Sequence, residues 1–159
     1  MGIDKNKAIV EYILQCPVIT NNPVFFNAIK AQDNSKGIVT LANDKVMSRP
    51  YIDGSILKRY SFTILDFRSI SFNPLVTIAG YDNENVKDLL DVQGIIDWVT
   101  EQDEERNFPD FGEGYFVEKI TTTTDNPNLN GVDNSTTPAL AKYSITVQVE
   151  YMDNTKRIF

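Results

Sequence analysis

The last strand of this protein is predicted by a strict alternation of apolar and polar residues. Between Tyr143 and Tyr151 every second residue is Ser, Thr, Gln or Glu, and the apolar ones are Tyr143, Ile145, Val147, Val149 and Tyr151. A period of two residues places all the apolar side chains on one face of a strand. The pattern therefore predicts an antiparallel strand with one covered face.

A long β-hairpin is predicted within Val46–Ile70. Asp53-Gly54, near its centre, supplies the positive-φ residues that a tight hairpin turn needs. The arm that follows is rich in β-branched and aromatic residues, and its apolar face carries Tyr60, Phe62 and Ile64. We expect the rest of the domain to be built on this hairpin.

The alternation changes phase inside the same arm. After Ile64 the apolar positions are Leu65 and Phe67, which leaves Asp66 and Arg68 on the polar side. A phase shift of this kind predicts either a β-bulge or a strand that is covered on both faces near its end.

Two helices are predicted by apolar residues at helical spacing. The first runs from Asp4 to Gln15, and Cys16 belongs to its apolar face, so we expect a buried thiol rather than a reactive one. The second covers Asn85–Glu105, and Gly94 inside it indicates close packing on the sheet. Its apolar stripe contains Leu89, Val92, Ile96 and Val99.

The remaining segments are shorter or irregular. Strands are predicted at Ile38–Leu41 and Tyr115–Thr123, and a short helix is predicted from Pro23. A loop rich in Asn, Thr and Pro is predicted at Thr123–Ala141. Together these elements predict one α+β domain over residues 1–159, with a mainly antiparallel twisted sheet of about four to five strands and two main helices on one face.

The composition narrows the classes of function. The 159 residues carry a formal net charge of −7, with one cysteine and no histidine. An acidic domain repels phosphate, so we expect no broad nucleic-acid interface, and no apolar run suggests a membrane span or a secretion signal. A single cysteine forms no internal disulfide, and a chain without histidine lacks the commonest general base and metal ligand. Folding in a cytoplasm is the default expectation.

No catalytic, cofactor or metal site is predicted, and we expect the protein not to be an enzyme. Residues 126–131 resemble the first half of a calcium loop, but Asn126 replaces the first aspartate and Thr137 the final glutamate. Two groups of acidic residues bracket the second helix, and we expect both to be solvated: Asp82, Glu84, Asp88 and Asp91, then Glu101, Asp103, Glu104 and Glu105.

The order of several short segments resembles a known family. These segments are Tyr51-Ile52-Asp53-Gly54-Ser55, the basic pair Lys58-Arg59, Tyr60–Ile64, Ile96-Asp97-Trp98-Val99, Asn107-Phe108-Pro109, Val117–Ile120 and Tyr143–Tyr151. Their succession and spacing, over nearly the whole chain, resemble the tail terminator (tail-to-head joining, or minor capsid) proteins of long-tailed phages and prophages.

The resemblance implies a structural virion protein. Such a subunit assembles in the host cytoplasm into a ring, typically a hexamer, at the head-proximal end of the tail. The ring caps the tail tube protein, ends tail elongation and offers a surface to the head-tail connector protein. The genomic DNA passes through without specific binding, and the acidic composition is compatible with this passage.

We predict that the hairpin and the Thr123–Ala141 loop contact neighbouring subunits or the tube. The predicted interface residues are Tyr51, Asp53, Gly54, Lys58, Arg59, Asn128, Asn130, Asp133 and Arg157. Two alternatives stay open at this point. One is a head-completion or connector subunit of the same particle, and the other is a small ligand-binding or enzyme domain that uses Tyr and Asp/Glu side chains.

Overall fold

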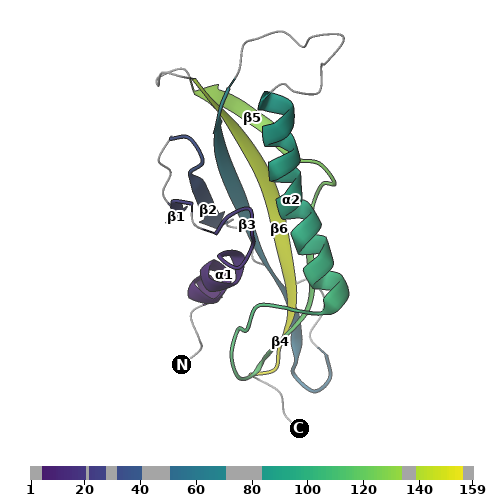
Figure 1. Ribbon diagram of the computed structural model, residues 1–159. Coiled ribbons are helices and arrows are strands. Elements are labelled where there is room, and N and C mark those ends of the chain that lie inside the picture. The colour runs from purple at the N-terminus through teal and green to yellow at the C-terminus, as the bar shows by residue number, and fades with distance from the viewer. Residues whose placement is uncertain are drawn as a thin grey trace.

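A computed structural model describes residues 5–20, 22–27, 32–40, 51–70, 84–133 and 139–155 (Figure 1). Its elements, in chain order, are α1 (Lys5–Ile13), β1 (Val24–Phe26), β2 (Lys36–Thr40), β3 (Ile56–Ser69), α2 (Glu84–Glu105), β4 (Tyr115–Thr122), β5 (Asn128–Asp133) and β6 (Leu140–Asp153). Asp4, the predicted start of the first helix, lies outside the described residues.

The described strands form one six-stranded sheet in the order β1-β2-β3-β6-β4, and β5 also pairs with β6. Only β1 and β2 are parallel; every other pair is antiparallel. The α+β class and the mainly antiparallel sheet are therefore confirmed, with more strands than the four to five predicted.

Both helices pack on the same face of the sheet (Figure 1). Their buried residues include Ile13 of α1 and Val99 of α2, and they meet the apolar side of β3 and β6. The alternation predicted for the last strand is confirmed, because its five apolar residues are all buried in this cluster: Tyr143, Ile145, Val147, Val149 and Tyr151. We call this side of the sheet the helix side and the opposite side the outer face.

The phase shift in β3 arises because both faces are covered, not because of a bulge. β3 pairs with β6 without a register shift from Ile56 to Ser69. Leu65 and Phe67 are buried on the outer face, where they form a second small cluster with Leu140 and Val39. The bulge alternative is therefore wrong, and the alternative of a doubly covered strand is confirmed.

The short helix predicted from Pro23 is wrong, because residues 24–26 form β1. Val24 and Phe26 pack against the main core, and β1 pairs in parallel with β2 from Val24↔Lys36 to Phe26↔Ile38. Asn27 then takes a positive φ of 49° and ends the strand. Pairing and burial, which the local sequence does not encode, outweigh the helix-start preference of proline.

The segment predicted as one long loop contains β5 and the start of β6. β4 and β5 lie end to end along β6, because Tyr115 pairs with Asp153 and Asp133 pairs with Leu140. A register shift interrupts each of them, at Val117/Lys119 in β4 and at Leu129/Gly131 in β5. The two strands together form one edge of the sheet.

Gly94 makes a close contact, but not with the sheet. A Cβ atom at this position would lie 3.0 Å from Cγ2 of Val18, which belongs to the connection between α1 and β1. The glycine therefore lets α2 approach that connection, which corrects the expected partner. Cys16, in the same connection, is fully buried and free, as predicted.

Candidate functional site

The turn before β3 is a three-residue hairpin turn. The N–H of Gly54 donates to Tyr51 O (2.9 Å), and the N–H of Tyr51 donates to Ser55 O (2.8 Å). Gly54 has a φ of 87°, whereas Asp53 does not have a positive φ. This pattern is typical of a type I turn followed by a left-handed glycine, rather than of a two-residue Asp-Gly turn. The preceding arm, before Tyr51, lies outside the described residues.

The carboxylate of Asp53 stabilises the turn. Its Oδ1 accepts hydrogen bonds from the backbone N–H of Ser55 (3.0 Å) and from Ser55 Oγ (2.6 Å). Because both bonds stabilise the turn, Asp53 acts by fixing the position of its neighbours Tyr51 and Ile52.

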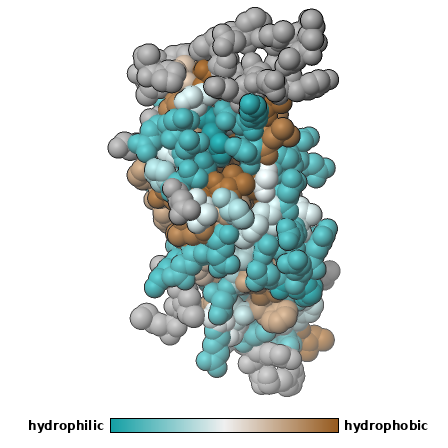
Figure 2. All heavy atoms as spheres, in the orientation of Figure 1, coloured by the Kyte–Doolittle hydropathy of each residue, from teal (hydrophilic) through white to brown (hydrophobic). Residues whose placement is uncertain are grey.

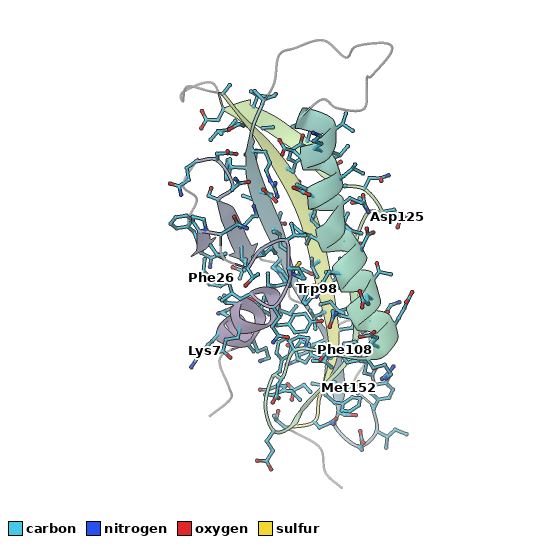
Figure 3. The ribbon with its side chains drawn as sticks, in the orientation of Figure 1. Lys7, Phe26, Trp98, Phe108, Asp125 and Met152 are labelled. Atoms are coloured by element: carbon cyan, nitrogen blue, oxygen red, sulfur yellow. The ribbon has the colours of Figure 1, made fainter. Side chains whose placement is uncertain are left out.

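These neighbours belong to an apolar surface at the end of the sheet. We define the tip surface as Tyr51, Ile52, Phe116 and Met152. Ile52 is 96% exposed and Phe116 is 56% exposed. Phe116 pairs with Met152 across β4 and β6 on the outer face, and Figure 3 shows Met152 at the same lower end of the molecule.

A shallow groove adjoins this surface. It has a volume of about 490 Å³ and is lined by Tyr51, Ile52, Asp53, Ser55, Glu118 and Met152. Exposed side chains as large as isoleucine and phenylalanine beside an open groove are typical of a protein-protein contact surface. Of the tip surface, Tyr51 is among the interface residues predicted from the sequence, whereas Ile52, Phe116 and Met152 are not.

Lys58 and Arg59 lie next to the turn, on opposite faces of β3. Lys58 Nζ lies 2.8 Å from Asp153 Oδ2, and Arg59 Nη2 lies 3.7 Å from Glu150 Oε1. Burial alone would raise the pKa of Asp153, but hydrogen bonds from Lys58 and Thr155 outweigh it and lower the pKa to about 2. The ion pair between Lys58 and Asp153 therefore links the start of β3 to the end of β6.

The predicted residues of the second group lie far from the tip. Asn128, Asn130 and Asp133 belong to β5, which pairs with the first residues of β6, whereas the turn adjoins the last ones. β5 is level with the last residues of β3, so the two groups lie about 30–40 Å apart along the strands. Arg157 lies outside the described residues, and the side chain of Asn130 is not described.

The β5 end has exposed apolar residues that the sequence analysis missed. Leu129 is 57% exposed and Val132 is 42% exposed. Leu89 of α2, predicted to be buried in the helix stripe, is also exposed. Gln93, one turn after Leu89, donates from Nε2 to Asp125 O (2.9 Å), which places this side of α2 next to the connection between β4 and β5. Figure 2 shows hydrophobic residues at the surface beside the upper end of α2.

A buried ionic cluster lies between the sheet and α2. Arg68 binds Asp66 through two bonds, from Nε (2.8 Å) and Nη2 (3.1 Å), and Lys36 Nζ lies 3.0 Å from Asp66 Oδ1. Arg68 Nη1 also lies 3.2 Å from Asp91 and 3.8 Å from Asp88. Burial lowers the pKa of Lys36 and raises that of Asp88.

This cluster corrects two predictions. Asp66 and Arg68, assigned to the polar side of the hairpin arm, lie on the helix side and are buried. Asp88, expected to be solvated, is partly buried and lies near Arg68, whereas Asp91 pairs with Arg68 but stays exposed, as predicted. Each charge is accommodated because an opposite charge lies within hydrogen-bond or ion-pair distance. A polar cavity of about 420 Å³ adjoins the cluster and is lined by Pro17, Val18, Asn22, Asn34, Arg68 and Asp91.

The second acidic group, at the end of α2, has a mixed outcome. Glu101, Glu104 and Glu105 are exposed, as predicted. Asp103 instead accepts a hydrogen bond from the N–H of Ile120 (3.0 Å), which joins α2 to β4. The calcium-like segment from Asn126 is not the expected turn-rich loop throughout, since β5 begins at Asn128.

Among the residues that the structure describes, no group of three His, Cys, Asp or Glu side chains could hold a metal ion. Neither of the two described helices is long and apolar enough to cross a membrane. No protein-family model matches the sequence, and no curated protein matches it significantly.

Proposed function

We propose that this protein is a structural subunit of a virus particle that forms a ring at the head-proximal end of a phage tail. In this proposal the ring caps the tail tube, ends its elongation and provides the surface that joins the head. The ring, typically a hexamer, is assembled in the host cytoplasm from the chain alone, without cofactor or catalysis.

The observation that carries the proposal is the separation of two exposed apolar surfaces. The tip surface lies at one end of the long strands, and the exposed residues Leu129 and Val132 lie at the other. A ring subunit on a tube needs two kinds of contact, one with its own copies and one with the tube or the head. Two apolar surfaces about 30–35 Å apart can serve these two roles at once.

The sequence supports the same proposal. The order of segments from Tyr51 to Tyr151 resembles the tail terminator family, and the net charge of −7 suits a ring through which DNA slides. We assign the tip surface to the tube or the head-tail connector, because Ile52 projects from a turn and is almost fully exposed.

Deleting the gene from its phage genome tests the proposal. We expect tails of uncontrolled length that do not join heads, as seen by electron microscopy of lysates, and rescue by the wild-type gene. Tails of normal length that stay separate from heads would instead indicate the head-completion or connector alternative. Normal particles would refute both.

A pair of variants tests whether rescue of this deletion requires the tip surface. Ile52→Asp changes a side chain that is 96% exposed, so we expect it to alter the free energy of unfolding by no more than about 0.5 kcal/mol. We nevertheless expect it to fail to rescue the deletion. Leu90→Asp changes a 66% exposed apolar residue of α2, away from the tip, and should rescue it. Equal rescue by the two variants would contradict the role of the tip.

A further inference from the structure

Two edges of the described sheet remain without a partner strand. β1 forms one edge, and β4 and β5 form the other. In Figure 3, Phe26 of β1 lies at the left of the molecule and Asp125, between β4 and β5, lies at the right. Unpaired edges are templates for pairing with another chain, so proteins usually protect them with charges, bulges or proline.

The edges differ in this protection. β4 has a bulge together with Glu118 and Lys119. β1 consists of Val24, Phe25 and Phe26, without a charge, and Phe25 belongs to neither buried cluster.

The β5 edge has a bulge and one acidic residue, Asp133, but no basic residue. Two apolar side chains, Leu129 and Val132, remain exposed on it. Leu89 of α2 extends this apolar surface on the helix side.

β1 and β5 also lie at the same level of the sheet. One row of paired residues runs across all five strands between the two edges, through Val24, Lys36, Asp66, Tyr143 and Leu129. A neighbouring copy placed beside the first without a shift along the strands would therefore bring its β1 to β5 and not to β4.

The strand directions suit the same arrangement. β1 runs parallel to β2, and three antiparallel pairings then lead from β2 through β3 and β6 to β5. β1 and β5 consequently run in opposite directions. A second copy in the same orientation would align its β1 with β5 as an antiparallel pair, the slightly more stable type.

We propose that β1 of one copy adds to the β5 edge of the next, so that one sheet continues between adjacent subunits. This contact joins two different surfaces, and such head-to-tail contacts close into a ring when the rotation permits. In the row described above, Val24 of one copy would then lie opposite the exposed Leu129 of its neighbour. The inference rests on the proposed function, because it names the contact that builds the ring.

Two single variants test this pairing, one on each edge. A lysine on an edge strand opposes strand addition, so Phe25→Lys and Leu129→Lys should each raise the concentration needed for assembly by about tenfold or more. Each variant keeps one intact edge. An equimolar mixture should therefore form dimers that grow no further, which sedimentation velocity would detect.

Leu90→Lys is the matched control, since it places the same charge on a 66% exposed apolar residue of α2, outside both sheet edges and the tip surface. It should assemble like the wild type. Circular dichroism and thermal melting of every variant show whether it is folded, and Val132→Lys replaces Leu129→Lys if the latter unfolds.

The possible outcomes separate the two proposals. Assembly that survives both edge substitutions would overturn the β1–β5 pairing and leave the ring proposal intact. Loss of assembly in Leu129→Lys alone would overturn it in favour of a β5–β5 contact. A wild-type protein that stays monomeric at every concentration would overturn the ring and the pairing together.

Discussion

Among single residues, the burial of charged side chains is what the sequence pattern does not predict. Asp66 lies between Lys36 and Arg68 and accepts hydrogen bonds from both. Alternation alone assigns an aspartate and an arginine to solvent, because it contains no information on partners from β2 and α2. Only the pairing of β2 with β3 brings Lys36 directly opposite Asp66.

Replacing Asp66 should therefore be costly. Asp66→Ala leaves two buried cations without their shared carboxylate, and we expect the free energy of unfolding to fall by about 3–5 kcal/mol. Lys36→Met keeps the two bonds between Arg68 and Asp66 and replaces a fully buried ammonium with an apolar chain. We expect this matched variant to change stability by no more than about 1 kcal/mol. Urea unfolding measures both, and a loss below about 1 kcal/mol for Asp66→Ala would contradict this role.

Asp153 makes stability depend on pH. Its pKa is about 2 in the folded protein, below the ordinary value of 3.8, so its ionised form stabilises the fold above pH 3.8. This contribution is lost as the pH falls from 3.8 to about 2. Because the partner Lys58 is partly exposed, we expect the contribution to be only about 1 kcal/mol.

The comparison of wild type with Asp153→Asn isolates this carboxylate from the others. The difference in free energy of unfolding should be constant above pH 5 and shrink toward zero near pH 2, by about 1 kcal/mol in total. Denaturant unfolding at several pH values measures it. A difference that does not vary with pH would show that Asp153 is not held ionised by its partners.

Among the helices and strands, the sequence predicts those whose hydrophobic pattern repeats over many residues. The alternation in β6 and the apolar spacing in α2 extend over nine residues or more, and both elements are present. β1 has three residues and β5 has six, of which two are asparagine and one is glycine. Such short strands form because β2 and β6 offer edges to pair with, and a local pattern does not record such partners.

The candidate surfaces are likewise predictable only where they depend on a local sequence signal. Tyr51, Asp53 and Gly54 could be located from the turn signal, which is local. Phe116 follows the turn by about 60 residues in sequence, and it joins the tip surface only because β4 pairs with the end of β6. The grouping of Leu129 and Val132 with Leu89 likewise depends on how α2 lies beside β5.

Considered as a whole, the molecule has its main core on one side of the sheet and its exposed apolar surfaces at the ends and edges of the sheet. The helices enclose the helix side, and the tip surface and the β5 edge lie apart along the long strands. With a net charge of −7, neighbouring copies repel one another, so moderate salt should favour assembly by screening this repulsion.

Sedimentation velocity of the wild-type protein over a series of concentrations shows whether the chain assembles into a ring. We predict that a monomer is replaced, as the concentration rises, by a single larger species whose mass is a fixed multiple of 18.0 kDa. Negative-stain images of that species should show closed rings. A protein that remains monomeric at the highest concentration, at both low and moderate salt, would contradict the claim that this chain builds a ring.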